Sequence, residues 1–430
     1  SADGDPAQLA AAAAAGDEAT PANNRRLSAV DRGGGPYRIL YVSGRPNWEF
    51  KFLRRALADD DQLELVGLVR IARREPKFSF RRRGERSTNS LFDGFEHPDD
   101  DAAESYDEPV LVRLGTADAE ELRGGFPRVA DELYRYDALI LDDIEADAFT
   151  QDQLTLIEEF VSRRGGALLM LGGAESFAAG NYRRSPVANA LPVYLDGPSA
   201  AATPPPSARL ALTREGWLEP WVRLRKTEPE DQQRLAEMPS FQTLNPAGLL
   251  KPGATLLAEA RDPAGAAHPA LAVQRYGRGR AAAMLLGDLW RWGLHRRSER
   301  DDDLGAWWRQ MARWLVTDVP RRVEVDVLAD DDGPPGAVTL RARVRDAEYL
   351  PLDNAEIAIR IAGPEGRDDE LTAEPSADEA GLYVARHVAR TPGPYRAAVS
   401  AVAPDGALVG ECRTGWAPQG PADEFQRRPP

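Results

Sequence analysis

Short apolar runs alternate with segments of helical periodicity along the first part of the chain. The apolar runs at residues 37–43, 63–71, 137–142 and 166–171 predict buried strands. Apolar residues at helical spacing predict helices over 48–57, 150–164 and 304–316, and Gly165 is placed to end the second helix. Strands that alternate with helices in this way predict βαβ units and a mostly parallel sheet.

The pattern changes further along the chain. Residues 254–260, 269–276 and 280–286 predict strands, the last two joined in a hairpin at 277–279. After Pro320 the apolar and polar residues alternate strictly, with turn residues between the segments and no helical spacing. This alternation predicts an all-β immunoglobulin-like sandwich, with strands near 323–327, 338–344, 355–361, 382–388 and 395–402.

These patterns predict four parts. Residues 1–35 are rich in Ala, Gly and Asp and indicate a linker or the end of a preceding domain. An α/β domain spans 36–320 and the sandwich spans 321–416. A Pro-rich tail follows at 417–430.

Composition removes several classes of function. The net charge of −15 argues against sequence-independent nucleic-acid binding, which needs a basic surface. No apolar run is long enough to predict a transmembrane segment in this sequence. The single cysteine, Cys412, excludes an internal disulfide framework and Cys-rich metal sites, and it limits thiol chemistry to one position.

Five segments together resemble the class I glutamine amidotransferase-like fold, a flavodoxin-like three-layer α/β sandwich. They are residues 39–50, 136–143, 165–177, 191–193 and 268–292. More narrowly, they resemble the amidotransferase-like domains of large bacterial membrane-anchored proteins, which often carry immunoglobulin-like regions. The resemblance implies the extracytoplasmic (periplasmic) side of a bacterial cell envelope, with membrane anchors of the parent protein outside this sequence.

The resemblance also implies where catalytic residues should lie. Enzymes of this class have a cysteine at a tight turn after a strand, and a histidine followed two residues later by glutamate. The turn after residues 167–171 is Gly-Gly-Ala-Glu-Ser-Phe (172–177, here called the elbow), which contains no cysteine. The residues after 286 are Gly-Asp-Leu-Trp, without a histidine. We therefore expect no glutaminase activity, but a catalytically silent module that binds protein partners as a scaffold in an envelope complex.

An altered hydrolase or amidotransferase is the alternative enzyme. Ser176 in the elbow would be its nucleophile, with His268 or His295 as base and Asp288 or Asp142 as the orienting carboxylate. In the simpler interpretation, Ser176 caps the following helical turn and the two glycines adopt positive φ.

A small-ligand or glycan sensor is the third hypothesis. Backbone amides at Gly172 and Gly173 could bind an anion or a carbonyl, if neither Trp48 nor Trp290 fills the adjacent space. Ser176, Trp48 and Trp290 are also candidate ligand-binding residues, because a sensor of this kind would use exposed tryptophans beside the elbow. The other candidates, Arg45, Asn47 and Asp142, follow predicted strands, where ligands bind in parallel sheets. Asp142 and Asp143 lack a second ligand cluster at suitable spacing, so neither a metal nor another cofactor is predicted.

Overall fold

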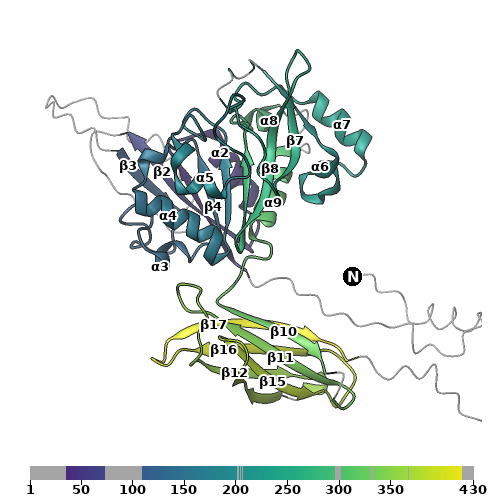
Figure 1. Cartoon of the computed structure of the whole chain (residues 1–430). Helices are drawn as coiled ribbons and strands as arrows, with labels where there is room; N and C mark the ends of the chain where they lie inside the picture. The colour runs from purple at the N-terminus through teal and green to yellow at the C-terminus, as the bar shows by residue number, and fades with distance from the viewer. Residues whose placement is uncertain are drawn as a thin grey trace, which may run out of the picture. The chain divides into compact units, whose positions relative to one another are not determined.

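The computed structural model describes residues 35–72, 109–200, 203, 205, 207–295, 302–330, 333–366 and 368–418. These fall into two compact units, one within Gly35–Pro320 and one from Arg321 onward (Figure 1). Most of the predicted linker (1–34) and of the tail (419–430) lies outside the described residues. In the part that is described, no helix is long and apolar enough to cross a membrane.

The first unit is built on a nine-stranded mixed sheet in the order β3-β2-β1-β4-β5-β9-β8-β7-β6. Its central strands β2, β1, β4, β5 and β9 are parallel, whereas β3 and β8-β7-β6 add antiparallel edges. The strands are β1 (Tyr37–Ser43), β2 (Leu63–Ala72), β3 (Pro109–Leu114), β4 (Ala138–Asp142), β5 (Ala167–Leu171), β6 (Arg209–Leu212), β7 (Thr255–Arg261), β8 (Ala267–Tyr276) and β9 (Gly279–Met284).

Helices cover both faces of this sheet (Figure 1). The chain moves from β1 to β2 in one direction and from β4 to β5 in the other, so right-handed crossovers place their helices on opposite faces. The helices are α2 (Trp48–Leu57), α3 (Ala130–Leu133), α4 (Gln151–Glu159), α5 (Pro186–Ala190), α6 (Arg214–Leu218), α7 (Glu228–Glu237), α8 (Trp290–Leu294) and α9 (Asp303–Val316). On α9, Trp307 and Trp308 are buried, as core packing requires.

Local chemistry explains the ends of the main helices. Thr150 and Gln153 form a reciprocal capping box at the start of α4. The predicted helix over 150–164 continues past α4 as a wider π turn, Phe160–Arg164, and ends at Gly165 with φ of 88°. Gly165 therefore provides the left-handed residue that the sequence predicted.

The second unit consists of two four-stranded antiparallel sheets. One has the order β10-β11-β15-β14 and the other β13-β12-β16-β17. The strands are β10 (Val323–Ala329), β11 (Ala337–Val344), β12 (Glu356–Ala362), β13 (Asp368–Thr372), β14 (Glu374–Pro375), β15 (Leu382–Val388), β16 (Tyr395–Val402) and β17 (Leu408–Trp416). Both sheets contribute to one core, including Leu340, Ile359 and Val399, so they pack face to face. Cys412 lies on β17.

Candidate functional site

The strand order reverses between β1 and β4, and the candidate site lies where these strands end. In open α/β sheets, the loops after such a pair of strands diverge and leave a crevice. Asn47 follows β1 and caps α2 by accepting a hydrogen bond from the Phe50 amide at 3.1 Å. Asp143 follows β4 with φ of 46°, a left-handed conformation that is uncommon for a residue other than glycine.

A buried cluster of polar groups lies beneath this crevice. The Asp142 carboxylate, 2% exposed, accepts hydrogen bonds from the Tyr41 hydroxyl and from Asn47 Nδ2. Asn47 Nδ2 also donates to Ser43 Oγ at 3.2 Å. Burial raises the pKa of Asp142, against the stabilising effect of the Tyr41 and Asn47 hydrogen bonds. Asp142 is thus a buried group that accepts two hydrogen bonds at Oδ2, rather than one exposed to a ligand.

Glu49 is the least expected member of the cluster. It lies in the first turn of α2, 4% exposed, and Oε1 has no hydrogen-bond partner among the described residues. Burial, followed by repulsion from Asp142, raises the pKa of Glu49 to about 9. The side chain is therefore protonated at neutral pH.

Asp288 is the residue predicted to orient a catalytic base, but its carboxylate binds backbone amides instead. It follows β9 and accepts hydrogen bonds from the amides of Gln242 at 2.8 Å and Thr243 at 3.2 Å. Arg291 Nε lies 3.5 Å from its carboxylate. Burial raises the pKa of Asp288, and the two amide hydrogen bonds oppose that shift. Asp288 holds the 242–243 segment and forms no hydrogen bond with a histidine in the described part of the chain.

Two amides of the elbow, those of Gly173 and Glu175, donate to side chains of the same unit. The Gly173 amide donates to Asn245 Oδ1 at 2.9 Å, and Asn245 Nδ2 donates back to the Gly173 carbonyl at 2.9 Å. The Glu175 amide donates to Asp143 Oδ1 at 2.8 Å, while Arg45 Nε lies 2.6 Å from Asp143 Oδ2. The Asp143 carboxylate therefore takes the place that an external anion would need at Glu175.

Ser176 is buried at 2% exposure. Its carbonyl accepts from the Gly180 amide at 3.1 Å, but no hydrogen bond among the described residues joins its hydroxyl to a histidine or carboxylate. The predicted helix cap is also wrong, since the chain runs through turns from residue 173 and its next α-helix is α5.

The two elbow glycines serve close packing instead of positive φ. The residues with positive φ here are Asp143 and Phe177, at 46° and 55°. A Cβ on Gly172 would lie 2.6 Å from the Leu285 carbonyl oxygen, and one on Gly173 would lie 2.4 Å from Asp143 Oδ1. The prediction of positive φ at the two glycines is wrong, since neither has it. Glycine is required at both positions because the neighbouring strand and loop leave no room for a Cβ.

An open hollow of about 490 Å³ lies beside the elbow. Arg70 and Glu145 form a bidentate ion pair across it, at 2.5 and 2.6 Å. Asn181 Nδ2 donates to Asp147 at 2.9 Å, and Glu175 adds a further carboxylate to the lining. Neither Trp48 nor Trp290 lines the hollow, but Glu175 is the only elbow residue that does, so this space is not the pocket at Gly172 and Gly173 that the small-ligand hypothesis requires.

The predicted bases do not join Ser176. His268 begins β8 and lies 3.3 Å from Asp262 in the β7–β8 hairpin, and this hydrogen bond lowers the pKa of Asp262. His295 is exposed at the end of α8. Within the described residues, the structure brings together Arg45, Asn47, Asp142 and the elbow, but it does not assemble a Ser–His–Asp triad.

The tryptophans near the site differ in exposure. Trp48 is 46% exposed, with Lys51 Nζ 4.4 Å from its ring centroid. Trp292 is 3% exposed and packs on Phe241, whereas Trp290 is partly buried. Around Asp142 and Asp143, as elsewhere in the described ranges, no group of three or more His, Cys, Asp or Glu side chains is arranged to hold a metal ion.

Sequence reasoning did not predict Tyr41, Glu49, Glu145 and Asn245 as site residues. Glu49 had a signal, because it lies four residues before Leu53 and so shares the buried face of α2. Asn245 had none, since it lies 72 residues from Gly173 in the sequence.

The elbow lies within a segment of the chain that matches the model of a known protein family. Residues 112–200 match the family model described as "Putative glutamine amidotransferase". The matched segment includes β4, α4, β5, the elbow and α5, so the resemblance predicted from the sequence is confirmed for this part of the chain. None of the curated proteins matches the chain.

Solved structures give only weak likenesses. The chain is 12% identical to a GH42 beta-galactosidase from G. stearothermophilus, with a TM-score of 0.25, and covers 32% of that chain with 59% of its own. It is 14% identical to a beta-galactosidase from Bacillus circulans sp. alkalophilus, with a TM-score of 0.26, and covers 34% of that chain with 60% of its own. The chain thus spans about a third of each enzyme, and at such TM-scores the likeness says nothing about its activity.

Proposed function

We propose that the unit Gly35–Pro320 is an amidotransferase-like domain that does not hydrolyse glutamine and acts as a binding module. One observation carries this proposal: side chains of the domain itself occupy two of the elbow amides. Asn245 accepts from Gly173 and Asp143 accepts from Glu175. An amide that already donates to a buried acceptor is not available to stabilise a reaction intermediate.

The missing nucleophile supports the same proposal. The class that the chain resembles uses a cysteine thiolate at the elbow, and the only cysteine of this sequence is Cys412 on β17 of the other unit. Ser176 is buried without a base, and Asp288 is engaged by the amides of Gln242 and Thr243.

The loop between β1 and α2 is the best-suited part of the module for contacting a protein partner. Its Arg45 side chain is 50% exposed and Trp48 is 46% exposed. Arginine and tryptophan are enriched among residues that dominate protein–protein binding energy. The buried Asn47–Asp142 hydrogen bond holds the loop from below, which reduces the entropy lost on binding.

Placing a thiol at the elbow tests the proposal. We expect Ser176→Cys and Ala174→Cys to release no ammonia from glutamine, because none of the described histidines is joined to the elbow to generate a thiolate. A coupled ammonia assay measures this, with Ser176→Ala as the matched blank. Glutamine turnover gained by either cysteine variant, and absent from Ser176→Ala, would show that the elbow retains a working site.

The open hollow favours one alternative, a module that binds a small polar ligand or glycan. Its charged lining, with Arg70 and Glu145 already paired, offers both donors and acceptors to hydroxyl groups. Saturable stabilisation of the protein by a neutral sugar, lost in Arg70→Gln, would favour this alternative over a protein-binding module.

We also propose that the second unit is an immunoglobulin-like sandwich. Successive pairs of strands alternate between the two sheets (β10 and β11, then β12 and β13, then β14 and β15, then β16 and β17), as expected of that fold, with β13 as an additional strand beside β12. At the start of β16, the Tyr395 hydroxyl donates to the Thr391 carbonyl at 3.0 Å, which is the pattern of a tyrosine corner. A scaffold role on the extracytoplasmic side of a cell envelope rests on the family resemblance.

A further inference from the structure

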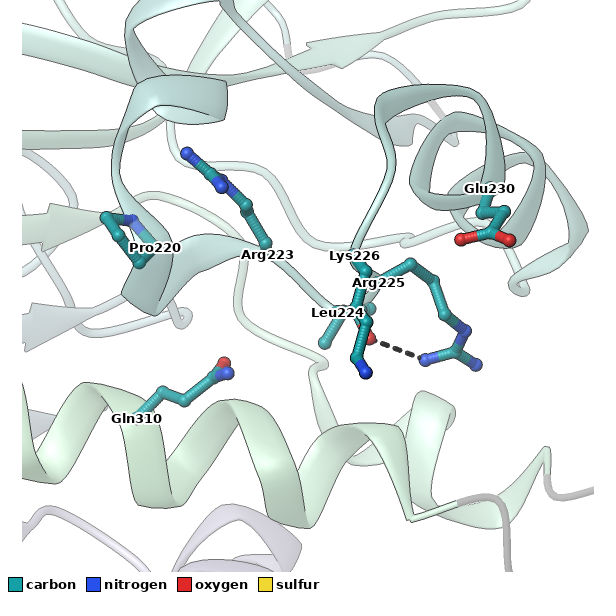
Figure 2. A pocket seen from close by; sticks show the side chains of 7 residues that line it. All are labelled: Pro220, Arg223, Leu224, Arg225, Lys226, Glu230 and Gln310. Carbon is teal, nitrogen blue, oxygen red and sulfur yellow. Dashed lines mark hydrogen bonds between the residues drawn. The ribbon is translucent and has the colours of Figure 1, made fainter. Parts of the chain in front are cut away.

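A basic hollow lies in the first unit between the 220–226 segment and α9 (Figure 2). Its volume is about 760 Å³, and its lining includes Pro220, Arg223, Arg225, Lys226, Glu230 and Gln310. Figure 2 shows Gln310 projecting from α9 toward this space, with Arg223 above it and Lys226 across from it. Three cationic side chains in four residues stand out on a chain whose net charge is −15.

The backbone of this segment is held in place from below. Asp231, 1% exposed, accepts hydrogen bonds from the Leu224 and Arg225 amides, both at 2.8 Å. Asp303 binds Arg225 Nη1 at 2.7 Å and also pairs with Arg234. The charge of Arg225 is therefore already balanced, and the segment that carries the other two cations is preorganised.

Two buried polar atoms of residues that line the hollow have no hydrogen-bond partner in the described part of the chain, and they are of opposite kinds. Arg223 Nε is a buried donor without an acceptor, although its guanidinium lies 4.5 Å above the Trp217 ring centroid. Gln310 Oε1 is a buried acceptor without a donor. Lys226 is exposed and forms no ion pair with any described residue. A buried donor or acceptor without a hydrogen bond destabilises the folded protein, and a ligand that forms the missing hydrogen bond would remove that penalty.

We propose that this hollow binds a small ligand that presents an oxyanion next to a hydroxyl or amine donor. The oxyanion, a carboxylate or a phosphate, would accept from Arg223 and Lys226. The adjacent donor would satisfy Gln310 Oε1. With Arg225 neutralised by Asp303, the remaining lining charges are Arg223 and Lys226 against Glu230, so the hollow keeps a net positive charge for an anion.

Isothermal titration calorimetry with three related probes tests the proposal. Glycerol carries no charge, D-glycerate carries a carboxylate, and glycerol 3-phosphate carries a phosphate, so the comparison also identifies the oxyanion. At matched ionic strength, we expect saturable binding of at least one of the two anions and none of glycerol. Binding of neither anion, or equal binding of glycerol, would overturn the proposal.

Variants locate the binding in the hollow. Arg223→Gln and Lys226→Gln should each lower the affinity for the anion by about tenfold or more, because each removes a charge-assisted hydrogen bond. Glu230→Gln should raise the affinity, because it removes a negative charge that repels the anion. Gln310→Leu should lower the affinity, because it removes the acceptor for the ligand's donor group. Arg183→Gln, an exposed arginine outside the hollow, is the control and should leave the affinity unchanged. Lys226 is exposed and its variant should fold normally, so unchanged affinity in Lys226→Gln would contradict the assignment.

Discussion

Replacing Glu49 with glutamine is expected to stabilise the protein at pH 8 by about 2 to 4 kcal/mol, while leaving its stability near pH 4.5 almost unchanged. The folded-state pKa is raised from 4.5 to about 9, so between these values the folded chain holds a proton that the unfolded chain releases. The contribution of protonated Glu49 to the free energy of unfolding is fully present below pH 4.5 and is lost as the pH rises through 9. Glutamine cannot ionise and avoids this loss.

Urea denaturation at both pH values measures the effect. Glu215→Gln is the matched control, because Glu215 is also the second residue of a helix but is exposed on α6. We expect Glu215→Gln to change the free energy of unfolding by less than about 0.5 kcal/mol at both pH values. If the gain from Glu49→Gln were the same at pH 4.5 and pH 8, the carboxyl group would not be held protonated.

Gly172→Ala should produce the largest loss of stability at the elbow, about 1 to 3 kcal/mol or more. The new Cβ would lie 2.6 Å from the Leu285 carbonyl oxygen and 2.7 Å from the Leu286 carbonyl carbon, both backbone atoms that cannot move independently. It would also lie 2.8 Å from Asn245 Oδ1, which accepts from the Gly173 amide. The substitution should therefore loosen the hydrogen bonds that occupy the elbow.

Gly124→Ala is the control for this prediction, because a Cβ there meets nothing within 4 Å and the residue does not have positive φ. The two variants are compared by their urea midpoints. An equal, small effect of both substitutions would mean that the β5 end has more space than these distances indicate.

The sequence predicted the central elements well because their signals are local. Residues 37–43 and 48–57 match β1 and α2, since a short, mainly apolar run and apolar residues at helical spacing are properties of residues close together in the sequence. Strand β3 (Pro109–Leu114) is not among the predicted strands, because its short apolar run follows a long polar segment. Pairing with β2 stabilises it, and that partner lies far away in the sequence.

The candidate site was predicted only in part, for a similar reason. Strand ends placed Arg45, Asn47 and Asp142 at one edge, and the structure brings them together there. The occupation of the elbow could not be predicted, because it depends on Asn245 from a connection without regular periodicity. Burial also decides the state of Glu49, and a glutamate at the start of a helix ordinarily indicates an exposed, ionised residue.

Glutamine turnover by the purified, unmodified chain tests the central claim most directly. The occupied elbow amides and the absence of a thiol from Gly35–Pro320 predict ammonia release no faster than that of Ser176→Ala under the same conditions. Saturable ammonia release by the unmodified chain that Ser176→Ala abolishes would contradict the claim and establish a serine-dependent amidotransferase.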